Sequence, residues 1–333
     1  MRYIVNDNTS APYNIAMDEW LLYKLKPKEP VFALWQNKSA VIVGKYQNTF
    51  EEVNEDYIKE HDVQVVRRVT GGGAVYHDSG NLNFTFIIPV ESSDQVDWKK
   101  FVEPMLVALK KLGIPAEASG RNDLLVNGKK VSGNAQRYAN GYLIHHGTLL
   151  FNSDIEAVVR SLNVSDEKFI SKAVKSVRSR VGNIHDTVPD LSLEDFKNAL
   201  IYELSDQGKD KEIILTDEQK AEIQDAADKK FSQWDWNYGS SPEFNYHAHE
   251  KFDGGIVDIK AQVENGIIQS ITFEGDFLGL EDLEEILPEF VGKPFSQAAI
   301  KDLLTKYEEK KYFGTVSTEE VASLFDDEQH GNK

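Results

Sequence analysis

The sequence predicts an α+β protein in which a sheet core is flanked by helices and followed by a second, small α+β domain. Strand-like and helix-like patterns are interspersed along the first 230 residues. An Asn-Gly pair between apolar strand patterns, a strong signal for a β-hairpin, occurs at 127–128 and again at 265–266. A polar stretch with glycine and proline separates the two halves, so we place the domains at 1–243 and 244–333.

The first domain contains one clearly alternating strand pattern. Leu82, Phe84 and Phe86 alternate with polar residues, which predicts a half-buried strand at 81–88. Mixed helical spacing and a following glycine predict the helices. The other expected elements are helix 13–25, strands 31–35, 40–43 and 63–66, helix 96–112, hairpin 124–131, strand 142–151 and helical segments within 154–230.

The second domain is expected to be small. A hairpin of strands 256–263 and 267–273 comes first, and helices near 279–288 and 296–309 follow. These elements are enough for an α+β module with its own core.

Composition excludes several classes of protein. The 333 residues are 41% apolar and 28% charged, which is typical of a globular protein, and no apolar run is long enough to span a membrane. The N-terminus lacks the apolar region of a signal peptide, so we expect a cytoplasmic protein. The absence of cysteine removes disulfides, thiolate metal sites and thiol nucleophiles. The net charge of −18 opposes nucleic-acid binding.

The most informative motif is an arginine pair followed by three glycines. A strand pattern ends at Arg67 and Arg68, Gly71, Gly72 and Gly73 follow, and a second strand pattern begins soon after. Glycine lets the backbone approach a ligand closely, and a cation beside exposed N–H groups suits a carboxylate or phosphate. Strands on both sides oppose a dinucleotide-binding or P-loop motif. The alternative is an ordinary glycine-rich turn.

The first Asn-Gly hairpin carries a pair of opposite charges. A type I′ turn pairs Leu125 with Lys130 and Asp123 with Ser132, so these four side chains share one face and Lys129 lies on the other. Asp123 and Lys130 are then diagonal neighbours that could hold a metal and a phosphate. The alternative is a surface ion pair beside a turn.

Two adjacent histidines lie in the strand 142–151. Because neighbouring side chains of a strand point to opposite faces, His145 and His146 cannot bind one metal together. We therefore expect at most one of them to face a pocket, and a strand histidine is more often a structural hydrogen-bonding residue.

A basic segment, 172–180, interrupts the acidic chain. It is either a solvated helix face or a loop that closes on a nucleotide phosphate.

These motifs, in this order, resemble the lipoate–protein ligases, of the single-chain bacterial type with a C-terminal accessory domain. The matching segments are 67–78, 120–123, 130–135, 145–150, 176–181 and 234–239. The resemblance implies a mixed or antiparallel sheet core flanked by helices, as in the biotin and lipoate ligases, followed by a mobile small domain.

The resemblance also implies a reaction. ATP and Mg²⁺ activate free lipoate, or octanoate, to an acyl-AMP. A lysine of an acceptor then takes the acyl group. The acceptors implied are lipoyl domains of 2-oxoacid dehydrogenase E2 subunits and the glycine-cleavage H protein, in lipoate salvage. We expect a monomer without nucleic-acid or membrane partners, because no unpaired apolar stripe is obvious.

Matching this sequence to the family motifs assigns candidate site residues. Lys130 is the expected catalytic cation, and Asp123 is the expected Mg²⁺ ligand. Trp35, Gly72, His77 and His146 are expected to line the lipoate pocket. The residues expected to bind ATP and lipoyl-AMP are Arg68, Gly71, Gly72, Gly73, Ala74, Val75, Tyr76, His77, Asn122, Asp123, Lys130, Ala135, His146, Thr148 and Lys172.

Two rival functions remain open on the sequence. Acyl transferases of this fold that pass the group between proteins need a cysteine thiolate, which this chain lacks. A catalytically weak binder of lipoyl-adenylate is the other alternative, and the presence of both Lys130 and Asp123 opposes it.

Overall fold

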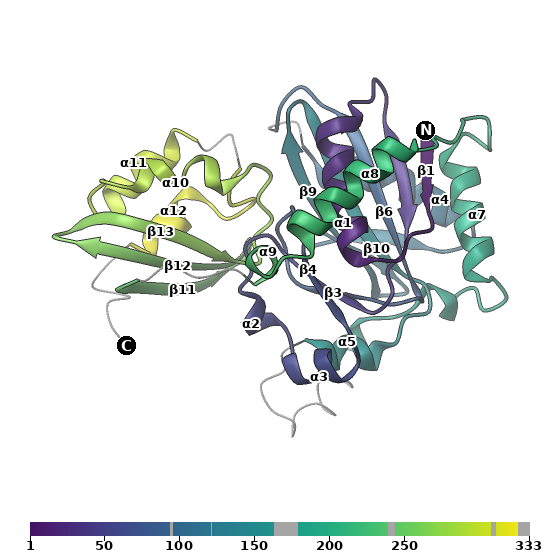
Figure 1. The fold of residues 1–333 in the computed structure, drawn as a ribbon, viewed down its shortest axis with the longest axis horizontal. Helices are drawn as coiled ribbons and strands as arrows, with labels where there is room; N and C mark the ends of the chain where they lie inside the picture. Colours follow the sequence, from purple (N-terminus) through teal and green to yellow (C-terminus); the bar gives the residue numbers. More distant parts are fainter. Residues whose placement is uncertain (94–95, 121, 163–178, 239–243, 308–310, 326–333) are drawn as a thin grey trace.

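The computed structural model describes residues 1–93, 96–120, 122–162, 179–238, 244–307 and 311–325. The first part of the chain forms a large body of sheets and helices, and the C-terminal module, residues 244–325, forms a smaller body beside it (Figure 1). The predicted α+β class is confirmed.

A mixed seven-stranded sheet forms the centre of the large body. Its β1 and β2 are parallel, and every other neighbouring pair is antiparallel. The strand order is β1 (Arg2–Asn6), β2 (Val31–Trp35), β6 (Asn81–Pro89), β10 (Tyr142–Leu150), β9 (Lys129–Ala139), β8 (Asp123–Val126) and β7 (Ala116–Ser119).

Helices cover both faces of this sheet. Trp35 and Ile87 face one core with α1 (Ala11–Trp20), the π-helical turn Leu21–Leu25, α8 (Asp217–Ala226) and the π-helical turn Ala227–Phe231. Phe32 and Phe86 face a second core with α4 (Trp98–Lys111) and α7 (Leu193–Leu204). Successive residues of one strand, such as Phe86 and Ile87, therefore belong to opposite cores.

A smaller sheet presents the glycine motif. Its order is β4 (Gln64–Arg67), β3 (Ala40–Val43) and β5 (Val75–His77), and α2 (Thr49–Glu52), α3 (Glu55–Glu60) and α5 (Ile155–Ser161) lie near it (Figure 1). The glycine loop, residues 68–74, connects β4 to β5. The expectation that strands flank the motif on both sides is confirmed.

The C-terminal module packs one three-stranded antiparallel sheet against short helices. Asn265 and Gly266 adopt positive φ angles of 51° and 74°, which confirms the second hairpin. The elements are β11 (Tyr246–Phe252), β12 (Gly255–Glu264), β13 (Ile267–Gly275), the 3₁₀ turn Leu283–Glu285, α10 (Leu287–Phe290), α11 (Gln297–Thr305) and α12 (Thr318–Ser323).

Two remaining short segments belong to the large body: the 3₁₀ turn Ile184–Asp186 and α9 (Trp234–Asn237). The latter lies at the junction with the C-terminal module in Figure 1.

The segment 275–282 of the C-terminal module docks onto the large body. Phe277 O accepts a hydrogen bond from Gly72 N at 3.1 Å, and Leu280 O accepts one from Tyr138 N at 2.8 Å. Asp282 binds both Lys45 and Arg137, the latter at 2.6 Å. The glycine loop is therefore one of the surfaces against which the module rests.

Two predicted elements differ from the structure. Strand β6 is buried on both faces over Asn81–Ile87 rather than half-buried, because helices cover the sheet from both sides. A helix was expected at 279–288, but residues 279–282 are not helical, and the 3₁₀ turn and α10 follow only from residue 283. Gly279 lies so close to Tyr312 that a Cβ would meet its carbonyl oxygen at 2.2 Å. Strands β1, β7 and β11 and helix α12 were not predicted from the sequence.

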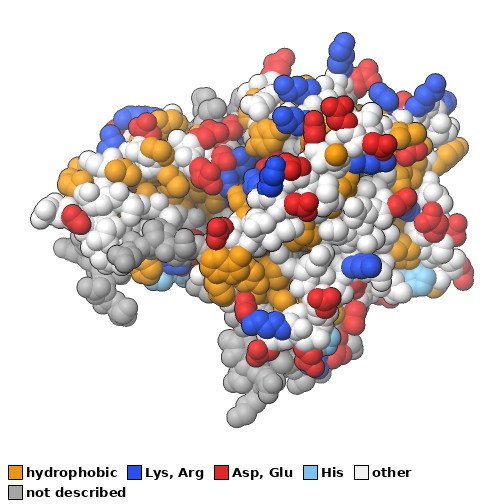
Figure 2. Space-filling view, viewed as in Figure 1, with side chains coloured by type: hydrophobic (Ala, Val, Ile, Leu, Met, Phe, Trp, Pro, Cys, Tyr) orange, Lys and Arg blue, Asp and Glu red, His pale blue; other side chains and the backbone are white. Residues whose placement is uncertain are grey.

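The surface carries mixed charges and one aromatic cluster. Acidic and basic side chains are interspersed on the face in Figure 2, and a hydrophobic patch interrupts them. Phe50 and Trp234 are 49% and 56% exposed, and both rings lie near Tyr238. Within the ranges that the structure describes, no helix is long and apolar enough to cross a membrane.

Candidate functional site

A pocket with a cavity volume of about 110 Å³ lies between the seven-stranded sheet, α1 and the glycine loop. It is lined by most of the residues that the sequence assigned to a site: Trp35, Arg68, Gly73, Ala74, Val75, His77, Asn122, Lys130, Ala135, His146 and Thr148. Residues that the sequence analysis did not single out complete its wall: Ile15, Ile42, Asn83, Gly133, Asn134 and Gly147.

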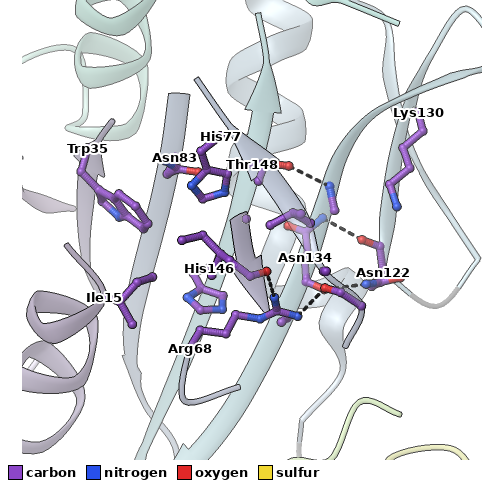
Figure 3. A pocket seen from close by; sticks show the side chains of 17 residues that line it. Ile15, Trp35, Arg68, His77, Asn83, Asn122, Lys130, Asn134, His146 and Thr148 are labelled. Carbon is purple, nitrogen blue, oxygen red and sulfur yellow. Dashed lines mark hydrogen bonds between the residues drawn. The ribbon is translucent and has the colours of Figure 1, made fainter. Parts of the chain in front are cut away.

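The pocket has an apolar end and a polar end. Ile15 and Trp35 lie at one side, and Asn122 and Lys130 lie at the other (Figure 3). An elongated ligand with an apolar tail and an anionic head fits this polarity.

Lys130 and Asp123 form the predicted pair at the polar end. Lys130 Nζ lies 2.7 Å from Asp123 Oδ1, and both side chains are about one-third exposed. The predicted register is wrong beyond Leu125, because a bulge between Leu124 and Leu125 pairs Asp123 with Gly133 and Leu124 with Ser132. Ser132 therefore lies on the opposite face from Asp123.

Arg68 is fully buried and holds the glycine loop. Its Nη2 donates to Gly71 O at 2.6 Å and to Gly73 O at 2.9 Å, its Nη1 donates to Ile42 O, and its Nε donates to Thr70 Oγ1. Burial, and to a lesser degree Arg67, lowers the pKa of Arg68 to about 10. Four of its five N–H groups are thus used within the protein.

Arg67 has a structural role instead. Its guanidinium donates to Gly44 O, to Trp236 O and to Asn237 O, and the Trp236 indole returns a bond to Arg67 O. It therefore connects β4 to α9 and explains why the 234–237 motif lies near the glycine loop.

The three glycines of the motif meet different neighbours. A Cβ on Gly71 would lie 2.4 Å from Phe277 O, and one on Gly72, whose φ is +90°, would lie 2.9 Å from the Leu278 side chain. A Cβ on Gly73 would meet nothing within 4 Å, and Gly73 lines the pocket. The first two glycines thus accommodate the C-terminal module, and the third faces open space.

His77 presents a free donor in the pocket wall. Asn37 Nδ2 donates to His77 Nδ1 at 3.0 Å, which leaves the proton on Nε2. That nitrogen is buried and, like Asn83 Nδ2, has no protein hydrogen-bond partner among the described residues. Burial, followed by Arg68 and His146, lowers the pKa of His77 to about 3.

The two adjacent histidines divide as expected. His146 lines the pocket. His145 points into the opposite core, where it bonds to Gln136 and Asn134, and burial lowers its pKa to about 3. The expectation that no more than one of them faces the pocket is confirmed.

The remaining candidates lie elsewhere. The Tyr76 side chain packs in a core with Val41 and Ile58 rather than in the pocket. Lys172 lies outside the described residues, together with most of the segment 172–180. Beyond that segment, Gly182 N donates to Lys130 O, so this part of the chain lies beside the strand that carries Lys130.

The surroundings of Asp123 bear on its expected role as a metal ligand. No group of three or more His, Asp or Glu in the described part of the chain could hold a metal ion. Mg²⁺ commonly takes one or two carboxylates and completes its shell with water and substrate phosphates. Asp123, which pairs with Lys130 at the polar end, offers one such carboxylate.

The polar groups behind the pocket were not predicted from the sequence. Asp18 of α1 is buried and binds His146, and Thr70 and Thr85 complete the contacts around this pair. No local pattern singles out Asp18, since it lies 128 positions from its histidine partner.

Comparison with known proteins defines the class of this fold and site. A family model described as the lipoyl protein ligase A/B catalytic domain matches residues 10–205, and one described as the bacterial lipoate protein ligase C-terminus matches residues 241–325. The pocket lies within the first of these regions.

Individual relatives agree along the whole chain. The chain is 40% identical to lipoate-protein ligase LplJ of Bacillus subtilis, over 97% of this chain and 99% of the relative. It is 40% identical to lipoate–protein ligase 1 of Staphylococcus aureus, over the same shares. The chain therefore belongs to the lipoate–protein ligase family and is an enzyme of that family.

Solved structures support the same assignment. The crystal structure of P. falciparum LipL1 in complex with lipoate covers 92% of this chain and 94% of its own, with a TM-score of 0.78 and 27% identity. A lipoate-protein ligase A bound with ATP covers 72% of this chain and 98% of its own, with a TM-score of 0.61 and 29% identity.

Proposed function

We propose that this enzyme activates free lipoate with ATP and transfers the lipoyl group to a lysine of an acceptor protein. A carboxylate oxygen of lipoate attacks the α-phosphorus of ATP, the bond to the β-phosphate breaks, and pyrophosphate leaves. The neutral ε-amine of the acceptor then attacks the acyl carbon, the bond to AMP breaks, and the amine loses a proton. One observation carries the proposal: a pocket of a lipoate–protein ligase has an apolar end and, opposite it, Lys130.

The polarity of the pocket suggests how the substrates lie. The aliphatic chain and dithiolane would extend toward Ile15 and Trp35, and the carboxylate would lie near Lys130. The two anions repel each other as they approach, and a fixed cation offsets that repulsion and stabilises charge in the transition state. The backbone of the glycine loop beyond Gly73 would face the nucleotide.

We assign Arg68 an indirect role in nucleotide binding. Four of its donors hold carbonyls and a hydroxyl of the protein, so its main contribution would be a fixed loop and a positive field. Its remaining N–H could reach a phosphate. Gly71 and Gly72 belong to this loop, and Tyr76 follows it in β5; all three would contact the nucleotide through their backbone.

Mg²⁺ would be held by Asp123 together with the substrate phosphates. When bound, the ion would neutralise phosphate charge during adenylate formation. Asp123 pairs with Lys130 in this structure, so an ion bound to Asp123 would weaken that ion pair. Mg²⁺ and Lys130 would then both be available to the reacting phosphate.

We further propose that the catalytic domain ends at residue 243 and the accessory domain starts at residue 244. The match of a separate family model to 241–325 supports this division. The acceptors would be E2 lipoyl domains or the H protein, in lipoate salvage, and octanoate would be an alternative acid. The protein would be a cytoplasmic monomer. Phe50 and Trp234 form an exposed aromatic cluster that a second copy could cover, so the mass of the protein in solution is the test of its oligomeric state.

The direct test is a mass assay of acceptor modification. The protein, ATP, Mg²⁺ and lipoate are incubated with a purified E2 lipoyl domain and, separately, with an H protein. An ATP-dependent gain of one lipoyl group establishes the activity and names the acceptor. Pyrophosphate release without a mass gain would refute both acceptors but support the adenylation step. If neither pyrophosphate nor a modified acceptor forms, an adenylate-binding protein without ligase activity becomes the better hypothesis.

Lys130→Ala tests the assigned cation. Removing one group that stabilises transition-state charge lowers turnover by about 10²–10³-fold. We expect a loss of this size in lipoate-dependent ATP–pyrophosphate exchange. Lys129→Ala is the matched control, because Lys129 is the exposed neighbour on the same strand. Equal exchange by Lys130→Ala and wild type would refute the role.

A further inference from the structure

A buried carboxylate lies behind the candidate site. Asp18 is fully buried on α1, and no lysine or arginine pairs with it among the residues that the structure describes. Its Oδ1 accepts from Thr85 Oγ1 at 2.6 Å, and its Oδ2 lies 2.7 Å from His146 Nδ1. Thr85 in turn accepts from the Trp35 indole at 3.0 Å. A buried charge is costly unless its partners are well placed, so this position calls for a reason beyond packing.

The contacts continue from His146 to the glycine loop. His146 Nε2 lies 2.7 Å from Thr70 Oγ1, and the same oxygen accepts from Arg68 Nε at 3.1 Å. Arg68 then donates to Gly71 O and Gly73 O. A continuous chain of hydrogen bonds therefore leads from the Asp18 carboxylate to the loop carbonyls.

The directions of these bonds follow from the chemistry of the groups. The guanidinium can only donate, so Thr70 Oγ1 must accept from Arg68. A carboxylate accepts from His146 Nδ1–H, and in the neutral ring this leaves Nε2 as an acceptor. The Thr70 hydroxyl then donates to Nε2 and keeps a lone pair directed at Arg68. Asp18 thus determines how the ring and the hydroxyl are oriented.

The two ends of the chain also complement each other in charge. Arg68 and Asp18 are both buried, and their opposite charges are separated by one imidazole and one hydroxyl. A partner on one ring nitrogen fixes the orientation and tautomer of a histidine in the same way around metal sites.

We propose that Asp18 is a positioning residue for this site, which fixes His146 and, through Thr70 and Arg68, the conformation of the glycine loop. The effect on catalysis rests on the proposed function. The effect on the loop does not, and the two can be measured separately.

Four variants test the chain of contacts. Asp18→Asn keeps the shape of the side chain but replaces one acceptor oxygen by a donor. Thr70→Val removes the hydroxyl at similar volume, whereas Thr70→Ser retains it. Asp258→Asn is the matched control, because Asp258 is also a buried carboxylate that contacts two histidines, His247 and His249, but lies in the C-terminal module away from the pocket.

The first measurement is amide hydrogen exchange in peptides that cover residues 68–77. Loss of one buried hydrogen bond corresponds to about a tenfold change in an opening equilibrium. We expect about tenfold faster exchange in Asp18→Asn and Thr70→Val, and wild-type exchange in Thr70→Ser and Asp258→Asn. Unchanged exchange in Asp18→Asn, or equal acceleration in Asp258→Asn, would overturn the proposal.

The second measurement is lipoate-dependent ATP–pyrophosphate exchange. Because both substitutions interrupt one chain, the double variant of Asp18→Asn and Thr70→Val should be no slower than the slower single variant. Losses that multiply would show that the two residues act independently and refute the coupling. If the wild type catalyses no exchange, the proposed function fails, while the loop measurement still decides the role of Asp18.

Discussion

Gly71→Ala offers a sharp test of how the C-terminal module rests on the glycine loop. A Cβ at this position would lie 2.4 Å from Phe277 O, about 1 Å closer than an ordinary contact. The Cβ is fixed to the Gly71 backbone and Phe277 O is itself a backbone atom, so no side-chain rotation relieves the clash. It is relieved only if the loop and the segment 275–282 separate. The backbone of Gly71 does not have a positive φ, so alanine itself introduces no strain there.

The expected magnitude follows from the contacts that would be lost. Overpacking of this kind costs about 1–3 kcal/mol. The bond from Gly72 N to Phe277 O and the stacking of Tyr46 on Phe277 at 4.9 Å each contribute about 1 kcal/mol more. We therefore expect docking to weaken by about 3–5 kcal/mol in all.

The neighbouring Gly73→Ala is the matched control. A Cβ on Gly73 meets nothing within 4 Å, so docking should remain as in the wild type. Because Gly73 lines the pocket, this variant should instead raise the KM for the substrates. Hydrogen exchange at Gly72 N and in peptides spanning 275–282 reports docking. Equal exchange in Gly71→Ala and wild type, or equal acceleration in both variants, would refute the division of roles among the glycines.

Two further predictions concern charge and pH. Asp282→Asn removes the carboxylate that binds Arg137 and leaves Lys45 only Glu284, at 3.5 Å. Because the site is largely buried, docking should weaken by about 3 kcal/mol, seen as faster hydrogen exchange in peptides spanning 136–140. Unchanged exchange would count against the contact. Burial holds the pKa of His77 and His145 near 3, against about 6.5 unfolded, so the unfolded state binds more protons below pH 6.5. The contribution of these two histidines to the free energy of unfolding is therefore fully present above pH 6.5 and is lost on acidification. In urea unfolding, the free energy of unfolding should fall by about 1.4 kcal/mol per histidine between pH 7.5 and 5.5. His145→Gln should remove about half of this decrease in the free energy of unfolding. A free energy of unfolding that does not change with pH in the wild type would contradict the prediction.

Local patterns in the sequence predicted much of the fold. Strands 31–35 and 40–43 were placed to the residue, because short apolar runs between turn residues fix both ends. The turns at 127–128 and 265–266 adopt the positive φ angles that Asn-Gly favours. Where a long-range contact decided the conformation, prediction failed: the bulge in β8 and β9 shifted the register, and the segment 279–282 follows its docking surface rather than a helical pattern.

The sequence by itself determined the class of fold, the turn that brings Lys130 toward Asp123, and the glycine loop between two strands. These depend on residues close together in the chain, whose backbone preferences and alternation act locally. Only the tertiary structure decided that Gly71 meets Phe277, and that Asp18 reaches the loop through His146. Such contacts join residues more than a hundred positions apart, and they form only when several layers pack together, so no local pattern encodes them.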